Sequence, residues 1–230
     1  MDMLNKYYKA AKTILEMAYD RGYMNKIALN KTIFKTRYEM FVANNSGALD
    51  IHFENRRNKL VVSFLDGNKP EKQIIKRCER LIKANELKTS DDIVIVYNNI
   101  DEDGDEMSEN AKIKIRFLEK DNLKIFSLNE LQFNFSRHFL VPKHIRLDNL
   151  ETKRVVKLYR LQTKQQLPYL LTSDSQCRYN GFRVGEIVKI IRQSRTSGTS
   201  ISYRYVVLDK NEDNLENIAG NIFGQHLMER

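Results

Sequence analysis

The sequence predicts an α/β N-terminal domain over residues 1–136, followed by a small α+β C-terminal domain over residues 137–208. Three observations predict this organisation. Helical and strand patterns alternate through the first domain, which is the order typical of a sheet layered with helices. Strand-forming segments gather at the end of the second domain. The charge is also uneven, because residues 151–208 carry a net charge of +8, against +4 for residues 1–150.

The first domain is expected to open with a helix and a β-hairpin. Apolar residues recur at helical spacing from Leu4 to Ala18, and Gly22 follows as a stop signal. Residues 48–55 (ALDIHFEN) alternate apolar and polar side chains, and a polar turn separates them from the apolar residues 59–64 (KLVVSF). Two such runs around a short polar turn indicate a hairpin.

The rest of the first domain alternates helix and strand. Pro70 is a favourable helix start, and apolar residues follow it on one side of a second long helix. Residues 92–98 (DIVIVYN) form an apolar run typical of a buried strand, residues 108–119 are expected to be helical, and residues 123–127 (LKIFS) are a further strand.

The second domain begins near Val141-Pro142, where the spacing of helix-breaking and turn residues changes. A short helix is expected over residues 150–158, and a turn begins at Asp174. Residues 186–193 (EIVKIIRQ) and 200–208 (SISYRYVVL) are β-rich and flank a Gly/Ser/Thr stretch, so they predict a second hairpin.

Composition limits what else the chain can be. Cys78 and Cys177 stand apart, with no CxxC and no histidine at ligand spacing, which argues against a zinc site or a disulfide framework and suits a reducing compartment. The N-terminus does not resemble a secretory signal, and no apolar run approaches the ~20 residues of a membrane helix. We therefore expect a soluble intracellular protein. Residues 209–230 carry a net charge of −3 and form an acidic extension that is expected to be partly ordered at best.

The motifs of catalysis and cofactor binding are missing from the sequence. The acidic run 101–106 starts like a calcium loop, but position six is Glu106 instead of glycine and position twelve is Lys112 instead of an acid. Neither a glycine-rich phosphate loop nor a nucleophile elbow is found. We expect no catalytic residue, no metal and no cofactor.

Two alternatives to an assembly role remain open. A free-standing DNA-binding protein would suit the basic charge. The second alternative is a nuclease-like domain, degenerate or active. An active metal-dependent nuclease needs two carboxylates and a lysine held together. Asp50 could be the first carboxylate, but the strand that follows it carries neither an acid nor an internal lysine. The residues therefore favour binding or assembly over catalysis.

A series of residues in the second half carries a family resemblance. In order along the chain it comprises Leu128-Asn129-Glu130-Leu131, residues 138–144 (HFLVPKH), Gln166-Leu167-Pro168, Asp174, Arg178-Tyr179, Gly181, Gly185, Val188-Lys189-Ile190, Arg192, Ser194, Thr196, Gly198, Ile201 and Tyr203-Arg204. This series resembles the RNA polymerase subunit 5 family of eukaryotes and large DNA viruses, whose C-terminal half is similar to a small subunit of the archaeal RNA polymerases. The first half is similar mainly through its opening helix and Asp20-Arg21-Gly22-Tyr23.

The resemblance implies a non-catalytic subunit of a multisubunit DNA-dependent RNA polymerase. It implies that the first domain is a "jaw" lying near downstream double-stranded DNA, and that the second is an "assembly" domain docking on the largest subunit. The partners would be polymerase subunits, with no membrane involved. The location would be the nucleus for a cellular protein and the host cytoplasm or virion for a viral one.

The resemblance also implies two sets of candidate site residues. The candidate assembly interface comprises His138, Pro142, His144, Arg178, Tyr179, Lys189, Arg192, Tyr203 and Arg204. The candidate DNA-proximal loop comprises Ser108, Ala111 and Lys112. This loop departs from the family pattern because it follows the acidic run 101–106, which would repel a duplex that carries one charge per ~1.7 Å.

Overall fold

The structure is a computed structural model that describes residues 3–23, 30–43, 47–55, 58–65, 70–98, 109–116, 118–194 and 198–209. The chain divides into two compact units, residues 1–134 and residues 135–230. The acidic run 101–106 and nearly all of the predicted C-terminal extension lie outside the described residues.

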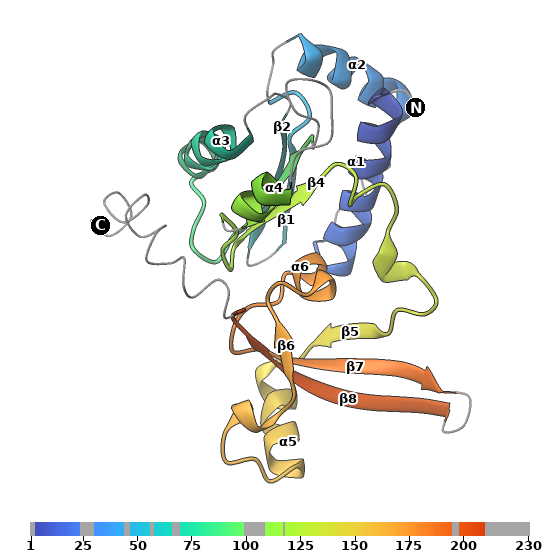
Figure 1. Cartoon of the computed structure of the whole chain (residues 1–230), viewed down its shortest axis with the longest axis vertical. Helices are drawn as coiled ribbons and strands as arrows, with labels where there is room; N and C mark the ends of the chain where they lie inside the picture. The colour runs from blue at the N-terminus through green and yellow to red at the C-terminus, as the bar shows by residue number, and fades with distance from the viewer. Residues whose placement is uncertain are drawn as a thin grey trace. The chain divides into compact units, whose positions relative to one another are not determined.

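The first unit is built on a four-stranded sheet (Figure 1). Its strands, in the order in which they pair, are β1 (Ile51–Glu54), β2 (Lys59–Leu65), β3 (Asp92–Tyr97) and β4 (Leu123–Ser127). The predicted hairpin is confirmed, since β1 pairs antiparallel with β2. The other two predicted strands are also present, and β2, β3 and β4 run parallel to one another.

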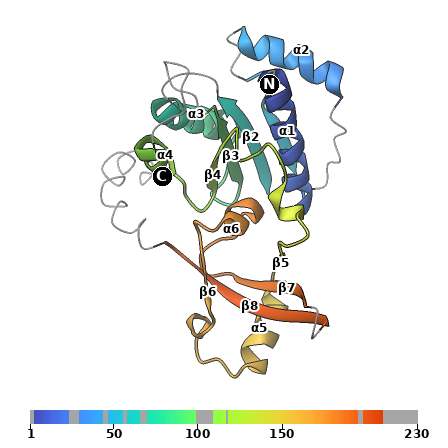
Figure 2. The same ribbon diagram turned by 45° about the vertical axis from the view of Figure 1, so that its right-hand side comes forward.

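Helices cover both faces of this sheet, as Figure 2 shows. The helix α1 (Met3–Asp20) lies on one face, and α3 (Pro70–Asn85) and α4 (Glu109–Arg116) lie on the other. Val61 and Leu65 of β2 belong to the core cluster with α3 and α4, whereas the Phe64 ring lies 6.0 Å from the Tyr7 ring of α1. Successive strand residues point to opposite faces, so a strand covered on both faces is apolar throughout.

The helix α2 (Lys31–Val42) was not predicted from the sequence. Only Phe34 and Phe41 of this helix are buried, so its apolar residues do not form a continuous helical stripe. The Asn30 side chain caps its N-terminus by accepting hydrogen bonds from the backbone N–H groups of Thr32 and Ile33, at 2.9 and 3.3 Å. The two phenylalanines hold α2 against Tyr8 and Tyr7 of α1, with ring centroids 5.4 and 5.5 Å apart.

The second unit contains a separate four-stranded sheet with the order β5-β7-β8-β6. Its elements are the 3₁₀ helices η1 (Phe135–Arg137) and η2 (Lys164–Gln166), the α-helices α5 (Asn149–Leu158) and α6 (Ser175–Asn180), and the strands β5 (Lys143–Arg146), β6 (Tyr169–Leu171), β7 (Ile187–Ser194) and β8 (Gly198–Val207). The predicted hairpin of β7 and β8 and the predicted short helix α5 are confirmed. Figure 1 shows that β7 and β8 extend well past the short strand β6.

A helix stands where the sequence predicted only a turn at Asp174. The Asp174 side chain accepts hydrogen bonds from the backbone N–H groups of Gln176 and Cys177, at 2.7 and 3.4 Å, and so caps α6. The helix ends at Gly181, which adopts the left-handed conformation with φ +64°. Six residues are too few to display helical periodicity, which explains the missed helix.

Each face of the second sheet carries a small core. On the α6 side the core consists of Leu170, Cys177, Phe182, Val188, Ile190 and Val206. On the α5 side it consists of Leu147, Val155, Leu167 and Ile187. Ile187 and Val188 are neighbours in β7 and therefore enter different cores. Among the described residues, no helix is long and apolar enough to cross a bilayer.

Candidate interaction surfaces

Asp50, the carboxylate weighed for nuclease chemistry, is held by its own unit. Its Oδ1 accepts a 2.7 Å hydrogen bond from the Ser63 hydroxyl, and its Oδ2 forms an ion pair with the Arg77 guanidinium. Burial is the largest influence on this carboxyl and raises its pKa, while Ser63 and Arg77 act in the opposite direction. Within the described part of the chain, no three His, Cys, Asp or Glu residues gather to hold a metal. Asp50 therefore ties β2 to α3.

The two cysteines are buried as thiols, and both pack in cores. Burial raises the pKa of the Cys78 thiol to about 12, so this side chain stays protonated and unreactive at neutral pH. The Cys177 sulfur lies 3.7 Å from the Phe182 carbonyl oxygen, within the turn that follows α6. Each thiol acts as a small apolar side chain.

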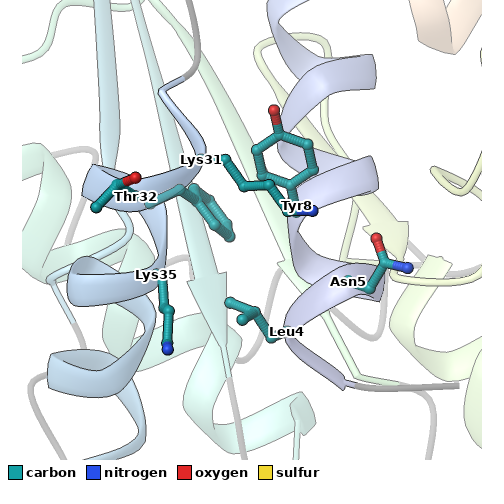
Figure 3. Close-up of a pocket in the computed structure, with 7 residues that line it drawn as sticks. Leu4, Asn5, Tyr8, Lys31, Thr32 and Lys35 are labelled. Atoms are coloured by element: carbon teal, nitrogen blue, oxygen red, sulfur yellow. The ribbon is translucent and has the colours of Figure 1, made fainter.

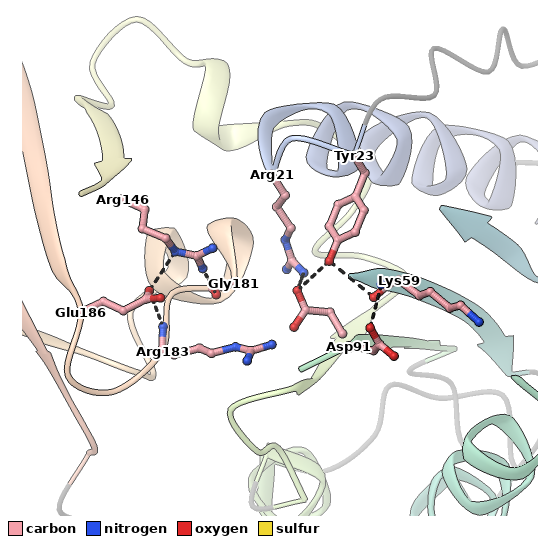
Figure 4. A network of polar contacts seen from close by, with 9 residues as sticks. Arg21, Tyr23, Lys59, Asp91, Arg146, Gly181, Arg183 and Glu186 are labelled. Atoms are coloured by element: carbon pink, nitrogen blue, oxygen red, sulfur yellow. Dashed lines mark hydrogen bonds and ion pairs between the residues drawn. The ribbon is translucent and has the colours of Figure 1, made fainter. Parts of the chain in front are cut away.

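The motif Asp20-Arg21-Gly22-Tyr23 joins the end of α1 to the sheet of the first unit (Figure 4). The Tyr23 hydroxyl donates a 3.2 Å hydrogen bond to Asp92 Oδ2, and the Arg21 guanidinium lies 3.8 Å from the same oxygen. Gly22 has φ +85°, a conformation that glycine adopts at little cost. These residues fix the turn that leads out of α1.

A pocket of about 520 Å³ lies between α1 and α2 (Figure 3). Its lining residues are Leu4, Asn5, Tyr8, Lys31, Thr32, Phe34 and Lys35. The lining combines apolar side chains with the exposed Lys31 and Lys35, and the described lining residues include no carboxylate, thiol or imidazole. This set of side chains suits contact with an apolar or anionic group.

The sheet of the second unit presents two different faces beyond its covered part. Directly paired residues of neighbouring strands share a face. The register therefore places Lys143, Ile145, Lys189, Ile191, Ile201 and Tyr203 on one face, which we call the tyrosine face. It places His144, Arg192 and Arg204 on the opposite face, which we call the arginine face. The predicted interface residues are thus divided between two surfaces.

The tyrosine face combines apolar side chains with lysines. Ile201 is 47% exposed, and Ile145 and Ile191 are partly exposed. The Tyr203 ring lies edge-on to the Tyr159 ring, with centroids 5.7 Å apart. Exposed apolar side chains grouped in this way are typical of a protein contact surface.

The arginine face is more polar and partly engaged. Arg192 and Arg204 are exposed, and Arg204 Nη1 donates a 3.3 Å hydrogen bond to the Tyr169 carbonyl. His144 is half-buried, with its Nδ1 2.8 Å from the Pro142 carbonyl oxygen. Burial is the largest influence on this imidazole and lowers its pKa.

Arg178 and Tyr179 differ from the other candidates because they are buried, with 5% and 0% exposure. The Tyr179 ring packs edge-on against Phe135, with centroids 5.6 Å apart. The described structure therefore gives Tyr179 a packing role, and the exposed candidates are the ones available to a partner.

Sequence reasoning missed Phe139 and Leu140, which are 86% and 73% exposed. The His138 ring lies 4.8 Å from the Phe139 ring, so the predicted residue His138 belongs to the same exposed segment. The available signal was a pair of large apolar residues in a loop that has no strand or helix pattern to bury them.

The ion pair of Arg146 and Glu186 was also missed (Figure 4). Arg146 Nε donates a 2.9 Å hydrogen bond to Glu186 Oε2, and Arg146 also donates to the Gly181 carbonyl. The Arg183 backbone N–H donates to the same glutamate oxygen at 2.9 Å. This network joins β5 to the loop between α6 and β7. Arg146 and its partners are 35 to 40 residues apart in the sequence, and no sequence motif predicted these contacts.

The candidate DNA-proximal residues are only partly described. Ser108 lies outside the described residues, and Ala111 lies in α4 with its side chain undescribed. Lys112 also lies in α4, where it is partly exposed. Their proximity to DNA stays a prediction.

Exposed apolar and basic side chains form surfaces on the second unit, while Asp50 and the two thiols serve internal packing. Residues 2–132 match the family model described as RNA polymerase Rpb5, N-terminal domain, and residues 133–206 match RNA polymerase Rpb5, C-terminal domain. The chain therefore belongs to the Rpb5 family of DNA-directed RNA polymerase subunits. The resemblance noted in the sequence is confirmed.

Several curated relatives agree with this family. DNA-directed RNA polymerases I, II, and III subunit rpabc1 of Dictyostelium discoideum is 30% identical over 210 residues, which cover 90% of this chain and 100% of the relative. DNA-directed RNA polymerase subunit 5-like protein 1 of Arabidopsis thaliana is 31% identical over 220 residues, covering 90% of this chain and 98% of the relative. DNA-directed RNA polymerases I, II, and III subunit RPABC1 of Caenorhabditis elegans is 31% identical over 219 residues, covering 90% and 99%.

Proposed function

We propose that this chain is a non-catalytic subunit of a multisubunit DNA-dependent RNA polymerase and that its second unit docks on the largest subunit. The observation that carries the docking proposal is the tyrosine face, where the exposed Ile201 stands among partly exposed isoleucines and lysines. A water-exposed apolar group of this kind is stabilised when a partner covers it.

Charge indicates the kind of partner surface. Residues 151–208 hold 11 lysines and arginines against three acidic side chains. Arg192 and Arg204 on one face, and Lys143 and Lys189 on the other, place positive charge on both sides of the hairpin. A partner with acidic residues around an apolar centre would complement it.

The first unit is proposed to lie near downstream DNA. Support comes from the family and from α4, where Lys112 and Lys114 are partly or fully exposed. The proposed location is the nucleus for a cellular protein, as the eukaryotic relatives imply, and the host cytoplasm or virion for a viral one.

The docking proposal is tested by placing a charge at Ile201, the most exposed isoleucine of the tyrosine face. Ile201→Asp should reduce recovery of the largest subunit with the tagged chain at moderate salt by roughly tenfold or more, since a desolvated carboxylate without a partner costs several kcal/mol. Co-purification from the native source, with identification of the bound subunits, provides the measurement.

Val184→Asp is the matched control. Val184 is 43% exposed, close to the 47% of Ile201, and lies in the loop before β7 instead of on the tyrosine face. This control should co-purify like the unchanged chain. Normal recovery of the largest subunit with Ile201→Asp would contradict docking through this face.

A further inference from the structure

The backbone groups of β8 alternate between its two sides. Val206 N–H donates a 2.9 Å hydrogen bond to the Glu186 carbonyl beside β7. Tyr205 N–H donates a 2.9 Å bond to the Pro168 carbonyl on the opposite side, and the Val207 carbonyl accepts a 3.0 Å bond from Thr172 on that side. Even-numbered residues of β8 therefore face β7, and odd-numbered residues face β6.

The side of β8 that faces β6 is covered over only a short length. The strand β6 pairs with β8 at residues 205–207, whereas β8 begins at Gly198. The odd-numbered residues Thr199, Ile201 and Tyr203 consequently direct their N–H and C=O groups to an edge with which no described strand pairs. We call the backbone of these three residues the open edge.

Proline explains why the ladder with β6 stops. In a parallel pair the hydrogen bonds recur every two residues. The Pro168 carbonyl accepts a bond from Tyr205 N–H, and the next bond toward the start of β8 would need the N–H of residue 168 as the donor to the Tyr203 carbonyl. Pro168 has no N–H to donate. The chain entering β6 therefore cannot extend the ladder along β8.

We propose that an extended segment of the largest RNA polymerase subunit pairs with the open edge of β8 and adds a strand to this sheet. This inference rests on the proposed function and specifies how the second unit docks. The open edge offers three N–H and three C=O groups over five residues, which is enough for a short added strand. Exposed edges of this length are otherwise sites of unwanted self-association.

The flanking side chains indicate the chemistry of the added segment. On one face it would lie beside Ile201 and Tyr203, which favours apolar residues at alternate positions. On the other face it would lie beside Ser200 and Ser202, with Arg204 at the end of the open edge and Arg192 paired with Ser200 across the hairpin, which favours acidic residues at the positions between. The proposed occupant is therefore an extended segment with alternating apolar and acidic side chains.

Amide hydrogen exchange of the unchanged protein provides the first test. In the isolated chain, the amides of Thr199, Ile201 and Tyr203 should exchange quickly, while those of Ser200 and Ser202 are slowed by their bonds to β7. In the purified polymerase, the odd-numbered amides should slow by roughly tenfold or more, because each gains a backbone partner. Site-resolved fragmentation with mass spectrometry measures both states.

The exchange test separates this inference from the proposed function. If the chain co-purifies with the polymerase and the odd-numbered amides still exchange as fast as in the isolated chain, strand addition is wrong and the subunit role stands. If the isolated chain is already a dimer with these amides protected, a second copy occupies the edge and the inference is likewise overturned. Failure to co-purify would instead overturn the proposed function.

A pair of substitutions at Ile201 provides the second test. Ile201→Pro removes an outward N–H, which the pairing with β7 does not use, so the chain should fold, as circular dichroism would show. Ile201→Thr keeps the N–H and the β-branched shape while removing apolar surface. Recovery of the largest subunit should fall at least roughly fivefold further with proline than with threonine. Equal recovery with two folded variants would overturn strand addition.

Should the Ile201→Pro chain fail to fold, Thr199→Pro against Thr199→Ala repeats the comparison at the next outward N–H.

Discussion

In the first unit, the charged side chains of Asp50 and Arg77 are largely buried and form an ion pair. The side chains of Asp50 and Arg77 are 11% and 12% exposed, and Ser63 also donates to the carboxylate. Taking both ions out of water is costly, so the pair is stable only while both members are present. The same removal from water raises the pKa of the Asp50 carboxyl, because burial disfavours its charged form.

Arg77→Ala should therefore destabilise the protein by about 3 kcal/mol at pH 7, because it leaves the Asp50 carboxylate buried without its main cation. The loss should shrink in acid, where Asp50 takes up a proton. Urea unfolding measures the change. Glu39→Ala is the control, since it breaks the exposed pair of Lys35 and Glu39, 4.0 Å apart, and should cost less than about 0.5 kcal/mol. Equal effects of the two variants would show that the Asp50 pair is not desolvated.

His144 makes stability depend on pH in the second unit. Burial lowers its pKa from the ordinary value of 6.5, so the unfolded chain takes up a proton at higher pH than the folded one. The stability that the neutral imidazole contributes is complete above pH 6.5 and is lost as the pH falls from there through the lowered pKa.

His144→Asn tests this dependence, because the amide can still donate to the Pro142 carbonyl and does not titrate. The unfolding free energy of the unchanged chain should fall more steeply with decreasing pH below 6.5 than that of the variant. Parallel curves for the two proteins would contradict a lowered pKa in the folded state.

At the scale of elements, short helices in this fold depend on their caps. In α6, Asp174 accepts hydrogen bonds from two backbone N–H groups, and six residues offer few internal bonds to compensate for a lost cap. Asp174→Ala should destabilise the protein by about 1 kcal/mol, whereas Asp174→Asn, which keeps an acceptor oxygen, should cost clearly less. Thermal unfolding of the three proteins measures the difference, and identical losses for alanine and asparagine would exclude capping as the cause.

Elements with a long pattern were predictable, and those without one were not. The opening helix and the helix after Pro70 display an apolar side over several turns, and the strands of both hairpins combine β-branched residues with polar turns. In contrast, α2 buries only Phe34 and Phe41, and α6 has only six residues. Tertiary contacts determine the secondary structure of those segments.

Candidate interface residues could be proposed from the sequence, but their arrangement on the sheet could not. The sequence identified Lys189, Arg192, Tyr203 and Arg204 as one set. Only the strand register shows that Lys189 and Tyr203 share one face while the two arginines share the other. The open edge was beyond prediction, because it depends on where β6 stops pairing with β8.

At the scale of the whole molecule, charge is concentrated in the second unit, and two kinds of partner could neutralise it. Binding to phosphates releases counterions, so affinity falls by orders of magnitude as salt rises. A protein interface with an apolar centre depends less on salt, since burial is not screened. The exposed apolar residues of the tyrosine face favour the protein partner.

The arginine face allows the two partners to be distinguished. Arg192 and Arg204 lie opposite Ser200 and Val188, on one face and about 14 Å apart along the strands at ~3.4 Å per residue. The double substitution Arg192→Glu and Arg204→Glu should lower recovery of the largest subunit by tenfold or more, which corresponds to a loss of at least roughly 1.4 kcal/mol of binding free energy. The reason is that two repulsive contacts replace two attractive ones. Lys153→Glu with Lys157→Glu makes the same change of charge at exposed positions of α5 and should assemble nearly normally.

A salt titration of duplex DNA binding by the unchanged chain completes this prediction. Binding should be weak and independent of sequence near physiological salt, while co-assembly with the polymerase persists there. Equal losses with the arginine and lysine pairs would mean that net charge, and not the arginine face, governs assembly. Tight DNA binding with a steep salt dependence, together with normal assembly of the arginine pair, would make the second unit a nucleic-acid reader and reverse the roles proposed for the two units.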